Sequence, residues 1–312
     1  MNVRRYACAD KDTWNGFVGA SKNGLFMFDR GFMEYHKDRF EDCSLLFYEG
    51  DRLISLLPAS VKDGVLTSHA GLTYGGFVTG NEMKQHYMND CVTSLKAWAC
   101  ENGIREIVYK AVPHIYHRQP AEEDLYSLFC NKAQIEKIEA ATVINLSQPL
   151  EWEKRRIRML KKSEKAGVRV EESDCFVDFI DMQNFVLTKY HNTKAVHTGA
   201  ELSLLHERFP EQIKLYVGRY GGEIIAGCVV FVYDNLVHTQ YLAANDLARE
   251  IGALDFVIFN LIEMYAPTKT WFDFGKSTEG DGTFLNEGLI AQKEGFGGRT
   301  VVYQTWRMSA RR

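Results

Sequence analysis

The sequence predicts an α/β protein (α+β by some definitions) made of two similar domains, each a mixed β-sheet flanked by helices. A β-hairpin, a strand, a helix and a further strand follow one another twice along the 312 residues. A shift of 171 residues places the turns of the first copy on those of the second without a gap. A change in composition near Pro149 predicts two domains, 1–150 and 151–312.

The first copy follows a stretch with mostly helical character, residues 12–42. Two apolar runs are then interrupted by Gly50-Asp51, which is typical of a hairpin turn. Helical periodicity later stops before Gly103, where a glycine is expected to end a helix. The expected elements are a hairpin over 44–58, an extended segment over 65–76 after a turn at Asp63-Gly64, a helix over 83–101 and a strand over 105–110.

The second copy has the same order. Its elements are a hairpin over 214–233 that turns at Gly221-Gly222, a strand over 236–244, a helix over 253–265 and a strand that begins at Trp271. Gly50 aligns with Gly221 and Ile54 with Ile225, although few other identities support the match. We interpret the pattern as an internal duplication, and a chance resemblance between two hairpins is the alternative.

Composition narrows the classes of protein to consider. The net charge of −4 argues against bulk affinity for nucleic acid. The N-terminus lacks the apolar core of a signal peptide, and no window approaches eighteen uninterrupted apolar residues. Seven scattered cysteines, never spaced as C-x-x-C, fit reduced thiols rather than a disulfide framework or a zinc site. We expect a soluble cytoplasmic protein with no membrane span and no metal.

A basic segment lies between the two copies, at residues 151–167. Its cations recur at three- and four-residue spacing, so they can share one side of a helix; they are Lys154, Arg158, Lys161, Lys162 and Lys165. One interpretation is a solvated helix face. The other is a groove for a phosphate-bearing substrate, because Arg and Lys suit phosphate.

The repeated order is the core order of the GNAT acyltransferase fold, and the whole chain resembles double-GNAT proteins related to the FemAB peptidyltransferases. Several phrases strengthen the resemblance to a bacterial branch associated with surface-polysaccharide synthesis. They are His69-Ala-Gly-Leu-Thr-Tyr-Gly-Gly76, the segment Pro113–Tyr126, Gly252-Ala-Leu-Asp255, Phe272-Asp-Phe-Gly275 and the segment Leu285–Gly298.

The resemblance implies a site for an acyl-CoA donor. The GNAT signature Q/R-x-x-G-x-G/A precedes a helix whose free N–H groups bind pyrophosphate. Here Arg249-Glu-Ile-Gly252-Ala-Leu254 stands between the strand over 236–244 and the helix over 253–265, with Leu254 in place of the final small residue. We assign Arg249, Gly252, Ala253 and Gln240 to the donor, and an incidental arginine at a helix start is the alternative.

The stretch from Trp271 to Asn286 is the first candidate for the chemistry, because ligands usually sit at the carboxyl end of a strand in an open sheet. Acyl transfer to an amine needs a base and donors for the oxyanion. We predict Glu279, His69 and Lys276 as catalytic residues; a turn ligand, a buried structural histidine and an ion pair with Glu279 are their structural alternatives. The predicted substrate-binding residues are Tyr74, Tyr116, His117, Arg118, Ser277 and Asn286. Lys293, seven residues after Asn286, can reach the same pocket or face water.

These expectations together predict an N-acyltransferase that uses acetyl-CoA or another acyl-CoA. Its acceptor is expected to be the amino group of a small-molecule or lipid-linked sugar or of a cell-envelope precursor, met in the cytoplasm or at the inner face of the membrane. FemAB-type aminoacyl transfer from charged tRNA is a second hypothesis. A non-catalytic GNAT-like protein that binds a ligand is the third.

Overall fold

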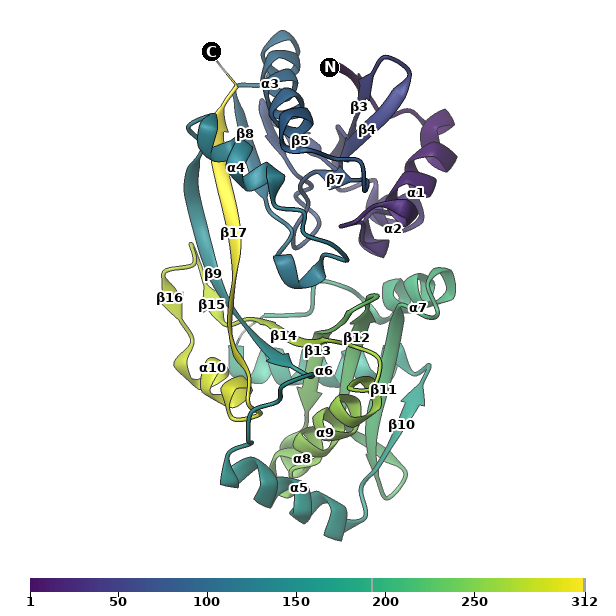
Figure 1. Cartoon of the computed structure of the whole chain (residues 1–312). Coiled ribbons are helices and arrows are strands. Elements are labelled where there is room, and N and C mark those ends of the chain that lie inside the picture. Colours follow the sequence, from purple (N-terminus) through teal and green to yellow (C-terminus); the bar gives the residue numbers. More distant parts are fainter. Residues whose placement is uncertain (192, 311–312) are drawn as a thin grey trace. The chain divides into compact units, whose positions relative to one another are not determined.

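The computed structural model describes residues 1–191 and 193–310, which form two compact units (Figure 1). Unit 1 contains Met1–Ala140, Gly280–Phe284 and the C-terminal residues from Val302; unit 2 contains Ala141–Glu279 and Leu285–Val301. The expected division at residue 150 therefore differs from the observed one. Two long strands explain the difference, because β9 (Gln134–Asn145) and β17 (Arg299–Ser309) each contribute residues to both units.

Unit 1 contains a four-stranded sheet in the order β1-β3-β4-β7. It also contains part of an eleven-stranded sheet, in the order β9-β17-β8-β6-β5-β2. The helices and strands are β1 (Asn2–Arg5), α1 (Lys11–Ala20), α2 (Arg30–Met33), β2 (Glu41–Asp42), β3 (Leu45–Glu49), β4 (Arg52–Leu57), β5 (Ser60–Lys62), β6 (Val65–Thr67), β7 (Val78–Thr79), α3 (Gln85–Glu101), β8 (Glu106–Lys110) and α4 (Glu123–Cys130).

The stretch 12–42 is mostly helical, as expected, but in short pieces: α1, α2 and the 3-10 helices Phe26–Phe28 and Glu34–His36. Another expectation for unit 1 needs correction. The extended segment over 65–76 ends as a strand at Thr67. The chain turns back there, since His69 has a φ of 48° and Gly75 lies against the Ser68 carbonyl with no room for a Cβ atom.

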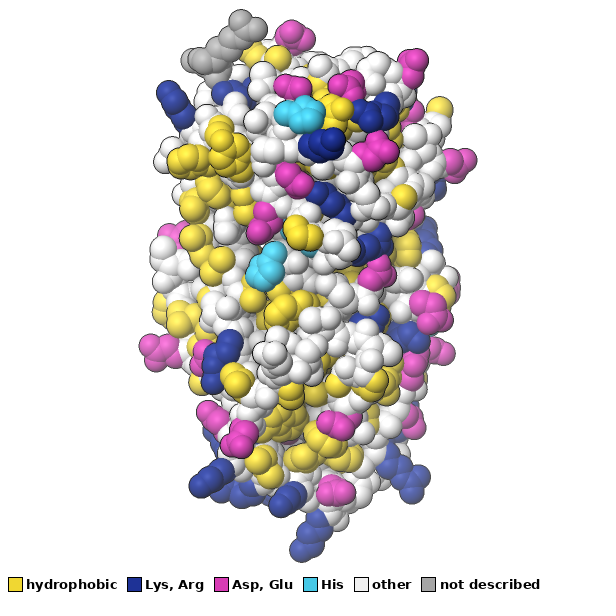
Figure 2. All heavy atoms as spheres, viewed as in Figure 1, with side chains coloured by type: hydrophobic (Ala, Val, Ile, Leu, Met, Phe, Trp, Pro, Cys, Tyr) yellow, Lys and Arg dark blue, Asp and Glu magenta, His cyan; other side chains and the backbone are white. Residues whose placement is uncertain are grey.

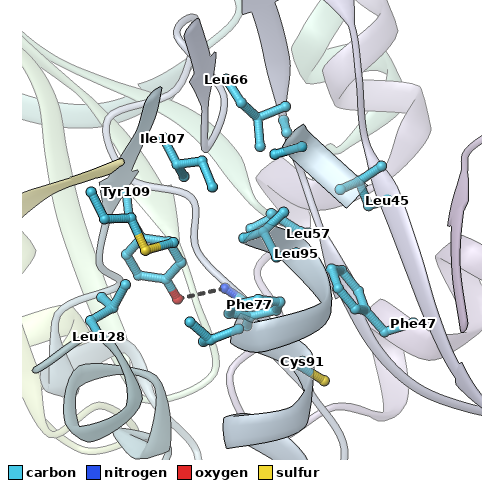
Figure 3. Close-up of a cluster of buried hydrophobic side chains, with 14 of the residues drawn as sticks. Leu45, Phe47, Leu57, Leu66, Phe77, Cys91, Leu95, Ile107, Tyr109 and Leu128 are labelled. Atoms are coloured by element: carbon cyan, nitrogen blue, oxygen red, sulfur yellow. Dashed lines mark hydrogen bonds between the residues drawn. The ribbon is translucent and has the colours of Figure 1, made fainter. Parts of the chain in front are cut away.

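The core of unit 1 packs α3 against the sheets (Figure 3). Cys91 and Leu95 lie on the buried face of α3, and Phe47 and Phe77 stand edge to face with ring centroids 5.2 Å apart. Tyr109 places a hydroxyl group among these apolar side chains. Its Oη accepts a hydrogen bond from the Phe77 backbone N–H at 2.8 Å and donates to the Asp124 carboxylate.

Unit 2 has one sheet in the order β10-β11-β12-β13-β14, completed by the end of β9. Its elements are α5 (Lys154–Ala166), β10 (Arg169–Ser173), α6 (Phe176–His191), α7 (Gly199–Arg208), β11 (Ile213–Tyr220), β12 (Glu223–Val232), β13 (Leu236–Ala244), α8 (Asp246–Ile251), α9 (Ala253–Tyr265), β14 (Trp271–Lys276), β15 (Thr278–Glu279) and α10 (Glu287–Glu294), with β16 (Phe284–Leu285) between the last two.

Helices cover both faces of the unit 2 sheet. A Cβ atom on Gly218 would lie 3.1 Å from Val257 of α9, whereas one on Gly227 would lie 2.9 Å from Phe179 of α6. Gly218 pairs with Ala226, the neighbour of Gly227, so the two glycines belong to opposite faces. The hydrophobic face of each helix is therefore buried against the sheet.

The strand pairings confirm the duplication predicted from the sequence. In unit 1, β6 pairs in parallel with β8; in unit 2, β13 pairs in parallel with β14, and Val65 and Leu236 begin the two pairs 171 residues apart. The hairpins also share an irregularity, since the register shifts after Phe47 in β3 and after Gly218 in β11, again 171 residues apart. A matched bulge is difficult to explain by chance, because bulges are specific features of a fold.

Within residues 1–191 and 193–310, no helix has both the length and the apolar character needed to cross a membrane. In the same residues no group of three or more His, Cys, Asp or Glu side chains is arranged to hold a metal ion.

Candidate active site

The central feature of unit 2 is a fork between two parallel strands. β13 and β14 pair only at their first three positions, from Leu236–Trp271 to His238–Asp273. Beyond His238, β13 continues to Ala244 without β14, while β14 pairs on its other side with β9. One edge of β13 is thereby left open, and the carboxyl ends of parallel strands are where α/β sheets bind ligands.

A pocket of about 540 Å³ opens beside the end of β13. Its floor is Leu242, Ala243 and Ala244, the last residues of that strand. Side chains from four helices complete the walls: Arg155, Arg156 and Met159 from α5, Val186 and Leu187 from α6, Ala248 and Arg249 from α8, and Leu289 and Gln292 from α10, with Gly252, Leu254 and Asp255 at the start of α9. Polar and apolar groups thus meet in one cavity of ligand size.

The N-terminus of α9 opens into this pocket. Gly252 precedes the helix with a φ of 81°, and no side chain among the described residues caps α9. The backbone N–H groups of the first turn are therefore available to an anion, and the helix dipole adds partial positive charge. Glycine is required at 252 by the left-handed backbone and by α5, because a Cβ atom there would lie 2.6 Å from the Met159 carbonyl oxygen.

Three arginines make the pocket positive. Arg156 Nη1 contacts both carboxylate oxygens of Asp255, at 2.9 and 3.2 Å. Arg155 and Arg249 form no salt bridge among the residues that the structure describes, although Asp255 and Asp246 are close enough to feel their charges. The Arg249 guanidinium lies 4.3 Å from the centre of the Tyr190 ring. Arg155 and Arg249 thus leave a surplus of positive charge beside the α9 N-terminus, which favours a phosphate-bearing ligand.

Gln240 is the extra residue of a β-bulge in β13. Thr239 and Tyr241 pair with the consecutive residues Val230 and Val229, which leaves Gln240 without a partner in the ladder. A bulge bends a strand and redirects its side chains. The bulge lies just past the point where β13 and β14 separate, so it contributes to the opening of the fork.

A comparison with known families agrees with this geometry. Residues 153–282, which contain the fork and most of the pocket, match the model of the acetyltransferase (GNAT) domain. This part of the chain, almost all of it in unit 2, is thus similar to a GNAT acetyltransferase domain. No curated protein matches the chain.

Solved structures with a similar fold cover nearly the whole chain. FemX is similar with a TM-score of 0.69 at 11% identity, over 98% of this chain and 97% of that one. A C-terminal domain assigned to a lysylphosphatidylglycerol synthetase from Agrobacterium fabrum gives 0.64 at 13%, over 96% and 91%. A tandem GNAT protein from the clavulanic acid biosynthesis pathway gives 0.57 at 8%, over 99% and 98%. The predicted FemAB-like double-GNAT fold is confirmed.

A buried acid–histidine pair lies at the base of the fork. His238 Nδ1 lies 2.9 Å from Asp273 Oδ2, and the two residues form the last pair of the parallel register. Asp273 is fully buried, and its Oδ1 also accepts the Gly275 backbone N–H at 2.7 Å. A proton on Nδ1 leaves the His238 Nε2 lone pair available, and that atom has no protein partner among the described residues.

Lys293 of α10 reaches the same region. Its Nζ donates to the carbonyl oxygens of Gly275 and Lys276, at 2.9 and 2.7 Å. Burial lowers the pKa of Lys293 to about 8, an effect that nearby Asp273 partly offsets. The lysine therefore holds the end of β14 next to the pocket wall formed by Leu289 and Gln292 on the same helix.

The polar segment after β14 is mostly occupied by its own contacts. Glu279 is exposed, and its Oε1 accepts a hydrogen bond from Asn286 Nδ2 at 2.8 Å. Asn286 also caps α10 by accepting the Leu289 N–H at 3.0 Å. Lys276 is exposed, whereas the Ser277 hydroxyl is buried with no partner in the part of the chain that the structure describes. Catalysis by Glu279 and Lys276, and substrate binding by Ser277 and Asn286, stay predictions.

His69 lies in unit 1, where it is 3% exposed. Its ring centre is 5.7 Å from that of His36 and 5.6 Å from that of Phe40. Burial, followed by the nearby His36, lowers the pKa of His69 to about 3. A ring that stays neutral down to that pH is a weak base, so its environment favours the structural alternative stated for it.

The predicted substrate-binding residues of unit 1 form an aromatic group. Tyr74 lies 4.7 Å from Tyr116 and 5.7 Å from Tyr303, between ring centres. His117 is buried with Nε2 3.1 Å from the Val112 carbonyl oxygen, and burial lowers its pKa to about 4. Arg118 Nη1 donates to the carbonyl oxygens of Gly19 and Ser21. These side chains thus make several contacts within unit 1, and their role in binding an acceptor stays a prediction.

His238 and Asp273 are the residues whose importance the sequence did not reveal, whereas Lys293 was expected to reach the pocket or face water and instead holds the end of β14. Asp273 stands between two phenylalanines in a strand, and a carboxylate in such a setting is a signal for a buried partner. The identity of that partner depends on the parallel pairing of β13 with β14, which joins positions 35 residues apart.

Proposed function

We propose that this protein transfers an acyl group from an acyl-CoA to an amino group, with the donor bound in the unit 2 pocket. The observation that carries the proposal is the convergence of the open β13 edge, the uncapped α9 N-terminus and the arginines in one cavity. Backbone N–H groups and Arg249 suit a pyrophosphate. The open edge of β13 offers hydrogen bonds to the extended amide chain that links this pyrophosphate to the thioester.

His238 is the proposed general base. The Asp273 carboxylate holds the imidazole with Nδ1 protonated, so Nε2 can take a proton from the attacking ammonium or amine. The amine nitrogen then bonds to the thioester carbon, the tetrahedral intermediate collapses, and the C–S bond breaks as CoA leaves as a thiolate. The proton held on His238 Nε2 passes to that thiolate, which gives the thiol of CoA and restores the neutral imidazole. Asp273 and Lys293 are positioning residues in this scheme, because each acts through the fork rather than on the substrate.

Aminoacyl transfer from charged tRNA is the second candidate. Its support is the likeness to FemX and to the domain assigned to a lysylphosphatidylglycerol synthetase, whose names point to transfer reactions on cell-envelope components. The acceptor in either version is an amine of a sugar, a lipid or a cell-envelope precursor. The two versions differ in the donor, so the donor is the first thing to measure.

Thermal unfolding with acetyl-CoA, with CoA and with no ligand tests the first candidate. A ligand at a hundred times its dissociation constant stabilises the folded state by about 2.7 kcal/mol. Arg249→Ala should abolish most of the shift, while Arg105→Ala, which removes an exposed arginine of unit 1, should leave it intact. No shift for the wild type at millimolar CoA would reject CoA as donor, and charged tRNA would then be tested in its place.

Catalysis is tested separately from binding. His238→Ala should keep the thermal shift with CoA but lower kcat by a factor of 100 to 10,000, roughly the contribution of a general base. Glu279→Gln is the matched variant for the base predicted from the sequence. Loss of activity in Glu279→Gln with full activity in His238→Ala would reverse the assignment.

A further inference from the structure

The exposed face of α5 has a use that the acyl-donor pocket does not explain. Lys154, Arg158, Lys161 and Lys165 recur at intervals of three and four residues, so they form one stripe along the helix. All four are exposed, and none has an ion pair or hydrogen bond from its side chain within the described residues. Figure 2 shows Lys and Arg side chains gathered at the lower end of the view, where Figure 1 draws α5.

The charge of this segment is opposite to that of the protein as a whole. Residues 151–166 contain seven Lys or Arg and three Glu, in a chain with a net charge of −4. The rest of the molecule is therefore clearly acidic. A negatively charged surface attracts the α5 end and repels the remainder, so electrostatics alone would orient the protein with α5 facing that surface.

An apolar groove of about 630 Å³ runs along the side of the same helix. Ile157 and Leu160 form its α5 wall, and Phe259 and Ile262 form its α9 wall. The segment before α5 closes one end with Leu150 and Trp152. Leu150 and Ile157 are 46% and 39% exposed, which leaves aliphatic surface open at the rim.

The groove and the stripe lie next to each other on the surface of α5. Ile157 is three residues after Lys154 and four before Lys161, so these cations flank it on the helix surface. Lysine stems can lie along apolar surface while their ammonium groups stay in water. A helix with cations beside the exposed Ile157, preceded by the exposed Leu150, has the arrangement that places helices at the boundary between lipid headgroups and acyl chains.

We infer that α5 and this groove dock the protein onto an anionic lipid bilayer. The stripe contacts the headgroup phosphates, and Leu150 and Ile157 insert at the level of the first acyl carbons. Charge complementarity selects an anionic partner, and the aliphatic rim favours a bilayer over an RNA. The phosphate backbone of an RNA offers nothing to bury that rim. The inference is independent of the donor, although the opposite flank of α5, through Arg155 and Met159, lines the donor pocket. A docked protein would thus hold that pocket close to a lipid-linked acceptor.

Vesicle co-sedimentation of the full chain tests the inference. The vesicles are phosphatidylcholine alone, or phosphatidylcholine mixed with an equal part of phosphatidylglycerol, at low and at high salt. We expect binding to the anionic vesicles that weakens with salt. Replacing all four stripe residues, as Lys154→Gln, Arg158→Gln, Lys161→Gln and Lys165→Gln, should lower the partition coefficient several-hundred-fold, from roughly a fivefold loss for each cation.

The matched control removes four exposed lysines from unit 1, as Lys37→Gln, Lys62→Gln, Lys84→Gln and Lys132→Gln. The control has the same net charge as the stripe variant and should bind the anionic vesicles nearly as well as the wild type. Leu150→Gln with Ile157→Gln should also weaken binding, with the salt dependence kept. Circular dichroism and the thermal shift with CoA confirm that each variant is folded.

Three results would overturn the inference. The wild type could bind neutral and anionic vesicles equally, or the stripe variant and its control could bind anionic vesicles equally. The third result is binding of wild type to tRNA, lost in the stripe variant, with no binding to vesicles, which would assign the stripe to nucleic acid.

Discussion

Lys293 should make the stability of this protein depend on pH in a predictable way. The side chain is 5% exposed, and burial lowers its pKa from 10.5 to about 8. Below pH 8 the lysine is protonated in both states, and the folded state bears the full cost of the buried ammonium. Between pH 8 and 10.5 the unfolded chain binds more protons, so the free energy of unfolding rises with pH. The shift corresponds to about 3 kcal/mol over that range.

The comparison to make is between wild type and Lys293→Met, by urea unfolding at several pH values from 7 to 10. Methionine leaves the Gly275 and Lys276 carbonyl oxygens without this donor, which is a cost that does not vary with pH. The difference between the two proteins should therefore shift in favour of wild type by 1 to 2 kcal/mol between pH 8 and pH 9.5, roughly 1.2 kcal/mol per pH unit at most.

Lys62→Met, which removes an exposed lysine, is the control and should run parallel to wild type. Other groups that titrate in this range, such as tyrosines, are common to all three proteins and cancel in the differences. Parallel curves for wild type and Lys293→Met would refute the reasoning, since they would mean that the ammonium keeps its ordinary pKa in the fold.

Two further predictions concern buried polar contacts. Tyr109→Phe should lower the free energy of unfolding by about 1–3 kcal/mol, because it leaves the Phe77 N–H and the Asp124 carboxyl without their shared hydroxyl; an unchanged urea midpoint would contradict it. Asp255→Asn should cost about 3–5 kcal/mol, because it leaves the Arg156 guanidinium buried without its carboxylate, and Arg156→Met with Asp255→Leu should recover most of that loss. Equal stability of the single and double variants would show that the ion pair is not the cause.

The sequence predicted the regular elements of unit 2 with good accuracy. The helix over 253–265 and the strand over 236–244 have the observed bounds, and the predicted basic helix is α5. These segments have strong periodicity and clear turn residues at their ends, so local rules are enough to place them. In the region 12–42 the sequence predicted the helical character but not the ends of the short helices, because the scattered aromatic residues do not mark them.

Local rules also placed part of the pocket. Arg249 and Gly252 both line it, and Gly252 ends α8 with a left-handed backbone, a common local role of glycine. Their part in binding a donor stays a prediction. The involvement of Arg155 and Arg156 was not predicted for that pocket. Their position depends on the packing of α5 against α9, which joins residues about a hundred apart in the chain.

The amino-acid sequence by itself thus determined the element order, the duplication and the glycine before α9, because each depends on short-range spacing. Only the tertiary structure decided which polar side chains meet. Asp273 finds His238 because β13 and β14 pair in parallel and then separate, and Lys293 reaches the Gly275 carbonyl oxygen because α10 folds back on β14. Such contacts depend on strand register and helix packing, which are set by the burial of whole faces rather than by any single motif.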